Sequence, residues 1–246
     1  MWSIKLGLIG LLIAMLDIGY WDRLKAMSAS MFPIKHVRIG GAFKYLDKAK
    51  IETLLQPVVQ TSFFTVDIQT LQSEVAALPW VDKVEVKRVW ADTLDFRIYE
   101  HKPVARWQGQ SLLNQRGELF TPEQTRGFEH LPSIKGSDGQ EHKLFTAMHQ
   151  IKKGLVDNGL DLVELEVTER QSWQLRLANG ISMQLGRQQP MQKLKRFLKV
   201  LPVLGYDKLD LIGNVDLRYP NGFSVLWKSD APIKWQHINL DGQVPG

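Results

Sequence analysis

Apolar residues dominate the start of the chain. Residues 6–16 are all apolar or glycine, and extending this run to Trp2 and Trp21 gives a segment of twenty residues with Lys5 and Asp17 towards its ends. A helix of twenty residues, at ~1.5 Å per residue, just spans the ~30 Å hydrocarbon layer of a bilayer. Aromatic side chains near both ends suit the membrane interfaces. The pattern predicts a single transmembrane signal anchor within residues 1–27.

Two other interpretations of this segment stay open. In a cleaved signal peptide, Lys5 is the basic region and Ala26-Met27-Ser28 the small-residue cleavage site, although charged and aromatic residues at positions 20–25 separate that site from the apolar run. A buried soluble helix is the third interpretation, because the uncharged run is only eleven residues long.

From residue 34 the period of the hydrophobic pattern changes several times. Alternating apolar positions mark three strands, and helical spacing marks two helices, each beginning at an aspartate that can cap it. The order strand, helix, helix, strand, strand indicates a small α+β domain and is the order of a POTRA domain, which we expect over residues 32–102. The predicted elements are a strand at residues 34–39, helices following Asp47 and Asp67, and strands around residues 84–86 and 94–98.

From Pro103 the pattern becomes rich in strands and predicts a second, mixed α/β domain over residues 103–227. Arg116-Gly117 and Asn179-Gly180 predict hairpin tips, Asn-Gly being the strongest short hairpin signal. Apolar residues at helical spacing predict helices at residues 140–158 and 190–201. The cations of the second helix, among them Lys193 and Arg196, are interpreted as its solvated face, with acidic partners or anionic lipid as the alternative.

The last predicted unit of this domain is a hairpin at residues 214–227. Apolar residues alternate on both sides of Pro220-Asn221-Gly222, and the proline argues for a place away from the middle of a sheet. We therefore expect this hairpin to form the edge of the domain. Residues 228–246, with two prolines and scattered polar residues, predict a flexible C-terminal tail.

Composition and motifs exclude several kinds of site. The chain contains no cysteine, so disulfides, thiolate catalysis and cysteine zinc sites are excluded. Its six histidines lack metal-binding spacing, and no P-loop, G-x-S-x-G or G-x-G-x-x-G motif occurs. The net charge of +5 is spread diffusely, which does not argue for nucleic acid. We expect no catalytic residues, no cofactor, no metal and no nucleic-acid partner.

Several runs of residues carry a resemblance to a known family. The sequence reads LPWVDKVEVKRVWADTL at residues 78–94, HKPVARW at residues 101–107, SWQL at residues 172–175 and VDLRY at residues 215–219. With these runs, residues 32–227 resemble the FtsQ/DivIB family of bacterial cell-division proteins, which combine a POTRA domain with a β domain. Trp80 and Trp90 are expected to pack against the POTRA helices.

The resemblance implies a non-enzymatic scaffold that links early and late division proteins. It implies that the end of the β domain holds FtsB, which comes with FtsL, and thereby controls septal peptidoglycan synthesis. An exposed edge strand offers unpaired backbone groups that a partner strand can extend. The residues to which this role is carried are Arg170, Arg218, Tyr219, Gly222, Phe223, Val225 and Trp227.

The resemblance also implies a place in the cell. We expect a single-pass protein of the inner membrane at the division septum, with a cytoplasmic N-terminus and periplasmic C-terminal domains, and with other division proteins bound through the POTRA domain and the anchor. Cations following the anchor outnumber Lys5, but long domains are translocated largely regardless of charge. The alternative function is a POTRA-containing component of protein transport or chaperoning in the envelope.

Overall fold

A computed structural model describes residues 32–59, 61–228 and 236–239 of the chain. The predicted anchor at residues 1–27 therefore lies outside the described residues. Within the described ranges, every helix is too short or too polar to span a bilayer. The described residues divide into two compact units, one ending at His101 and one beginning at Lys102.

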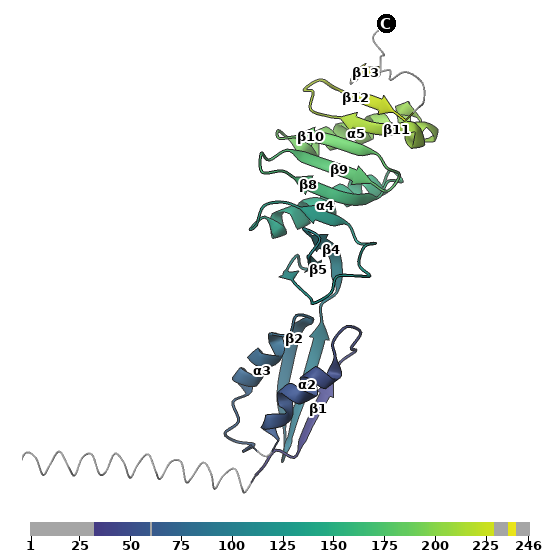
Figure 1. The fold of residues 1–246 in the computed structure, drawn as a ribbon. Helices are drawn as coiled ribbons and strands as arrows, with labels where there is room; N and C mark the ends of the chain where they lie inside the picture. The colour runs from purple at the N-terminus through teal and green to yellow at the C-terminus, as the bar shows by residue number, and fades with distance from the viewer. Residues whose placement is uncertain (1–31, 60, 229–235, 240–246) are drawn as a thin grey trace, which may run out of the picture. The chain divides into compact units, whose positions relative to one another are not determined.

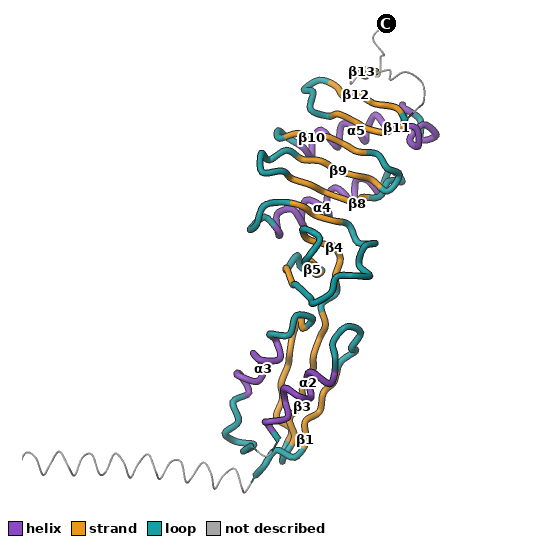
Figure 2. Tube along the Cα trace, in the orientation of Figure 1, coloured by secondary structure: helices purple, strands orange, loops and turns teal. Residues whose placement is uncertain are grey.

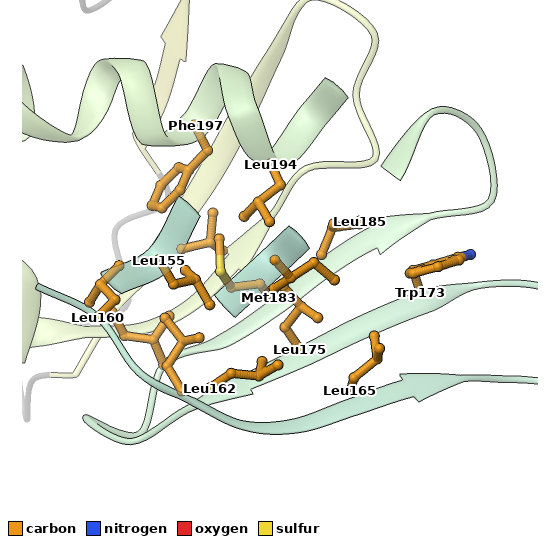
Figure 3. Close-up of a cluster of buried hydrophobic side chains, with 14 of the residues drawn as sticks. Leu155, Leu160, Leu162, Leu165, Trp173, Leu175, Met183, Leu185, Leu194 and Phe197 are labelled. Atoms are coloured by element: carbon orange, nitrogen blue, oxygen red, sulfur yellow. The ribbon is translucent and has the colours of Figure 1, made fainter. Parts of the chain in front are cut away.

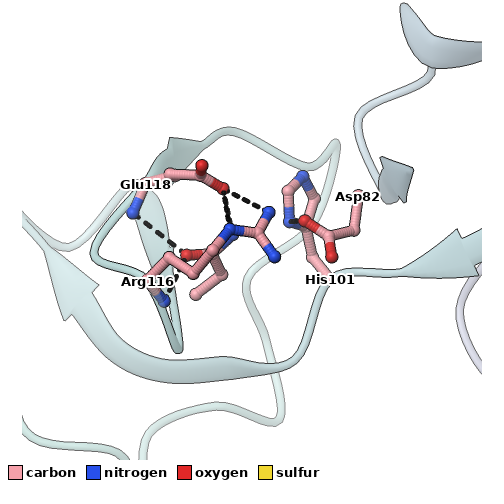
Figure 4. A network of polar contacts seen from close by, with 5 residues as sticks. Asp82, His101, Arg116 and Glu118 are labelled. Carbon is pink, nitrogen blue, oxygen red and sulfur yellow. Dashed lines mark hydrogen bonds and ion pairs between the residues drawn. The ribbon is translucent and has the colours of Figure 1, made fainter.

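The N-terminal unit is a three-stranded sheet with two helices, in the predicted order (Figure 1). The central strand β3 pairs in parallel with β1 and antiparallel with β2. At one end of the sheet, the His101 backbone N–H donates to the carbonyl of Trp80, and His101 Nδ1 lies 3.1 Å from Asp82 Oδ1 (Figure 4). The elements are β1 (His36–Gly40), α2 (Lys48–Leu55), the 3₁₀ turn η1 (Gln56–Val58), α3 (Ile68–Ala76), β2 (Val81–Val89) and β3 (Thr93–Glu100).

Both helices of this unit begin at the aspartates that the sequence singles out. Asp47 accepts a hydrogen bond from the Ala49 backbone N–H at 2.9 Å, and Asp67 accepts from Gln69 and Thr70 at 2.9 and 3.2 Å. These bonds satisfy backbone donors that lack partners in the first helical turn. The predicted caps are confirmed.

The two tryptophans of this unit do not pack as predicted. Trp80 is only half-buried and stacks on Tyr45, with ring centroids 4.3 Å apart. The Trp90 side chain is 70% exposed. The expectation that both rings pack against the helices is wrong, because the core between helices and sheet is filled by aliphatic residues, Phe63 and Phe96 instead.

The described part of the C-terminal unit is built on one mixed sheet with the strand order β13-β12-β11-β10-β9-β8-β7-β4-β5-β6. Most neighbours are antiparallel, but β10 pairs in parallel with β11, and β7 pairs in parallel with both β4 and β8. The strands are β4 (Pro103–Trp107), β5 (Ser111–Asn114), β6 (Leu119–Phe120), β7 (Ser133–Lys135), β8 (Leu162–Val167), β9 (Trp173–Leu177), β10 (Ser182–Gly186), β11 (Ile212–Asp216), β12 (Gly222–Trp227) and β13 (Gln236–Asn239).

Helices α4 (Glu141–Val156) and α5 (Pro190–Leu204) cover one face of this sheet, and a 3₁₀ turn η2 (Tyr206–Leu211) leads into β11. Leu165, Leu175 and Met183 lie side by side on three adjacent strands and meet Leu155 of α4 and Phe197 of α5 (Figure 3). Because alternate residues point to opposite faces, the sheet is apolar towards the helices and polar on its other face. The unit therefore has two layers around one core.

Both predicted hairpin tips are found. Gly180 adopts a φ of +87° between β9 and β10, and Gly117 a φ of +77° between β5 and β6. Around the second tip, the Asn114 side chain and Arg116 both donate to Glu118 Oε2, at 2.7 Å from Asn114 Nδ2 and 3.0 Å from Arg116 Nε (Figure 4). Left-handed backbone favours glycine at these positions.

Candidate partner-binding edge

Several candidate residues come together at one end of the C-terminal sheet. The turn from β8 to β9, the end of β10 and the turn from β11 to β12 all lie at this end, as Figure 2 shows. Arg170 is exposed in the first turn, and Arg218 and Tyr219 follow the end of β11. Since neighbouring strands are ~4.8 Å apart, the step from β9 to β12 is roughly 15 Å. We call this set, Arg170, Arg218, Tyr219 and Gly222, the strand-end patch.

An ion pair orders the centre of the strand-end patch. The Arg218 guanidinium donates to both carboxylate oxygens of Asp216, with Nε–Oδ1 at 2.9 Å and Nη2–Oδ2 at 2.6 Å, and the Arg218 backbone N–H donates to Oδ1. Burial alone would raise the pKa of Asp216, but these hydrogen bonds and the Arg218 charge hold that pKa below its usual value. The Arg218 side chain remains 60% exposed, so its charge is presented to solvent.

A glycine allows Arg218 to take this position. Gly186, the last residue of β10, has a φ of +73°, and a Cβ added there would lie 3.1 Å from Arg218 Cγ. Both the backbone conformation and the space favour glycine. The stem of Arg218 therefore lies over the end of the neighbouring strand.

Helix α5 supplies two more cations to the same end of the sheet. Lys193 Nζ donates to the carbonyls of Leu185 and Arg218, at 3.1 and 3.3 Å, and Arg196 Nη1 donates to the carbonyl of Pro220 at 2.8 Å. Desolvation, followed by repulsion from Arg196, lowers the pKa of Lys193. The pattern along the helix predicts a solvated face here. Helical spacing cannot reveal that backbone carbonyls from a distant turn approach two of its residues.

The remaining candidates lie elsewhere. Phe223 and Val225 are buried at 3% and 0% exposure, and the Phe223 ring packs edge-on against Phe197 of α5 at 5.3 Å. Trp227, at the far end of β12, is half-buried and packs against the core. Strand β12 has six residues, so Trp227 is about 17 Å from Gly222, the member of the strand-end patch at the start of the strand. Tyr219, in contrast, is 47% exposed.

The edge of the sheet differs from the prediction. Residues Gln236–Asn239, in the segment predicted as a flexible tail, form β13 and pair antiparallel with β12, from Gly222 opposite Asn239 to Val225 opposite Gln236. The hairpin of β11 and β12 is therefore not the edge of the described sheet. The strand is only four residues long, which is too short for its alternation to stand out in the sequence.

Both units match models of known protein families. Residues 32–101 match the model of the POTRA domain, FtsQ-type, and residues 105–218 match the model of the cell division protein FtsQ/DivIB, C-terminal. The chain is 39% identical over 219 residues to the cell division protein FtsQ of Methylomonas methanica, covering 89% of this chain and 88% of the relative. It is 36% identical over 240 residues to that of Shewanella oneidensis, covering 97% and 90%.

A third relative is similar over most of its length. The cell division protein FtsQ of Xanthomonas campestris is 33% identical over 225 residues, which cover 91% of this chain and 78% of the relative. The identity is at this level over most of both chains, and the first unit has the expected order of strand, helix, helix, strand, strand. The resemblance seen in the sequence therefore reflects homology. The chain belongs to the FtsQ/DivIB family of bacterial cell-division proteins, with an FtsQ-type POTRA domain followed by the family's C-terminal domain.

Proposed function

We propose that the chain is a division scaffold whose C-terminal unit captures the FtsB–FtsL pair and thereby controls septal peptidoglycan synthesis. A partner segment from FtsB adds as a strand to β12, in the place that β13 occupies in the isolated chain. The strand-end patch meets the partner where this strand begins. No bond is made or broken by the scaffold itself.

One observation carries this proposal. Strand β12 pairs with β11 through residues 224–227 and, on its other side, with the short strand β13 through residues 222–225. Among the described residues, the β13 side of Leu226 and Trp227 has no paired strand. Backbone N–H and C=O groups along such a strand form a ready template for another chain. A longer partner strand can replace the short one and make more backbone hydrogen bonds.

The strand-end patch adds side chains suited to recognition. Arg218 presents an ordered positive charge, and Tyr219 an aromatic ring at 47% exposure, beside the first residue of β12. Aromatic and arginine side chains dominate the binding energy of many interfaces. We therefore assign partner contact to Arg170, Arg218, Tyr219 and the edge of β12, and a core role to Phe223, Val225 and Trp227.

The test is capture of the purified FtsB–FtsL pair by the full chain. Tyr219→Ala should weaken capture at least tenfold, about 1.4 kcal/mol, and leave the thermal unfolding midpoint unchanged. Val156→Ala is the matched control, because Val156 is 56% exposed at the end of α4 and lies at the opposite end of the sheet. Equal capture by both variants would contradict the assignment of Tyr219.

Localisation distinguishes this function from the transport alternative. Family membership favours a septal protein of the inner membrane, anchored by residues 1–27 with the described units in the periplasm. A fluorescent fusion should gather at midcell before constriction, and depletion should give filaments. Diffuse envelope fluorescence with normal division would favour transport or chaperoning instead.

A further inference from the structure

Three aromatic side chains of the N-terminal unit form an exposed cluster. Phe32, Phe64 and Trp90 are 38%, 54% and 70% exposed, and each ring lies within 6.4 Å of the other two, centroid to centroid. The buried ring of Phe63 supports Phe64 and Trp90 from below, at 5.5 and 6.0 Å. Exposed apolar side chains that gather in one place mark an interaction surface more often than scattered ones. We call Phe32, Phe64 and Trp90 the aromatic foot.

The backbone holds the aromatic foot in a fixed arrangement. The Phe63 N–H donates to the Phe32 carbonyl at 2.9 Å, and the Ile34 N–H donates to the Thr61 carbonyl at 2.9 Å. From β2, the Arg88 guanidinium donates to the carbonyls of Phe63 and Val66, at 3.1 and 2.8 Å. The segments that carry the three rings are thus tied together before any partner arrives.

The aromatic foot follows closely after the predicted membrane anchor in the sequence. Phe32 is five residues beyond the end of the predicted anchor at residue 27. Five residues span at most about 18 Å even when fully extended. The headgroup region of a bilayer occupies several ångströms of that distance on each side of the hydrocarbon core. A surface tethered this closely to a membrane anchor has the bilayer as its nearest neighbour.

We propose that the aromatic foot inserts into the headgroup region of the membrane and seats the N-terminal unit on the bilayer. Tryptophan and other aromatic rings are enriched at membrane interfaces, where an apolar body and a wet rim are both satisfied. The proposal rests on the membrane anchoring in the proposed function. It adds a second contact, made by folded residues, that limits how the periplasmic part turns about its tether.

The absence of cysteine in the sequence allows a direct test with the full chain in vesicles of neutral lipid. A fluorescent label is attached at Thr65→Cys, an exposed position beside Phe64, and in a second protein at Ala42→Cys. Ala42 lies at the other end of the sheet, between Gly41, which approaches the Ile98 carbonyl, and Lys44, whose backbone N–H donates to Glu100. This is roughly 20 Å away along β3. Lipids carrying a nitroxide near the headgroup quench only labels close to the interface.

The label at position 65 should be quenched at least about twofold more than the label at position 42, because interfacial side chains sit within ~10 Å of the headgroup boundary. Replacing Phe64 and Trp90 together by serine should abolish this difference. Both side chains are mostly exposed, so the unfolding midpoint should hardly change. Equal quenching at positions 65 and 42 in the otherwise unchanged protein would overturn the proposal.

Two further outcomes separate this proposal from its alternatives. Quenching at position 65 that requires anionic lipid and disappears in high salt would assign the contact to basic residues and overturn a role for the rings. Flotation with the vesicles reports the anchor independently. A chain that fails to float contradicts the anchoring in the proposed function, whereas a chain that floats without quenching at position 65 contradicts only the aromatic foot.

Discussion

At the scale of single residues, Asp216 is the carboxylate that holds Arg218 of the strand-end patch in place. Its side chain is 10% exposed and accepts three hydrogen bonds from the Arg218 guanidinium. Asp216→Asn should lower the free energy of unfolding at pH 7 by about 1–2 kcal/mol, a value discounted because the Arg218 side chain is largely exposed. Chemical denaturation of the full chain measures this loss.

The same substitution has a defined pH dependence. The folded-state pKa of Asp216 lies below its ordinary value of 3.8, so its ionised form stabilises the fold above that value, and this contribution is lost as the pH falls through the folded-state pKa. The difference between the two proteins should therefore be largest above pH 5 and shrink below pH 4. Asp210→Asn, at an exposed carboxylate, is the control. A difference that grows on acidification would contradict the role of Asp216.

Part of the candidate site could be predicted from the sequence residue by residue. The resemblance brought attention to Arg218 and Tyr219, which the structure places on an exposed strand end. Alternation in β12 predicted that Phe223 and Val225 share a face but could not say that this face meets Phe197, because that depends on where a helix some twenty residues earlier packs. The hydrogen bonds of Lys193 and Arg196 to backbone carbonyls of a distant turn could not be predicted for the same reason.

At the scale of elements, we expect the two helix caps of the N-terminal unit to contribute differently to stability. Asp67 accepts two backbone hydrogen bonds and a third from the Thr70 hydroxyl at 2.6 Å, whereas Asp47 accepts one from Ala49. Asp67→Ala should lower the free energy of unfolding more than Asp47→Ala does, because it removes more hydrogen bonds to the first helical turn. Thermal or denaturant unfolding of the two variants gives this order.

A matched change tests the mechanism of the cap. Asp67→Asn keeps an oxygen acceptor and should retain most of the stability that Asp67→Ala loses. Equal losses for the alanine and asparagine variants would show that the charge, rather than the hydrogen bonds, stabilises α3.

Element prediction succeeded where the signal is local and failed where pairing is distant. Caps, the Asn179-Gly180 tip and the amphipathic helices depend on neighbouring residues, and each is found. Strand β7 has three residues and exists through parallel pairing with β4 and β8, and β13 has four and exists through pairing with β12. Short strands of this kind carry too few residues for a period to be recognised.

At the scale of the whole molecule, the sheet of the C-terminal unit ends in a strand that competes with the proposed partner. If β12 receives the partner strand, β13 must leave, and the observed affinity is reduced by the free energy of that pairing. Four paired residues with few net hydrogen bonds contribute on the order of 1 kcal/mol. Ending the chain after Lys228 should therefore tighten capture of the FtsB–FtsL pair about fivefold.

The truncation needs a control that keeps the length of the chain. Ile238→Pro removes a backbone donor in β13 and should tighten capture to a similar degree. Sedimentation must accompany the titration, because an uncovered strand edge also favours self-association, which would mask the gain. Loss of capture in both altered chains would mean that the partner extends β13 itself, and that the last strand is part of the binding surface rather than its cover.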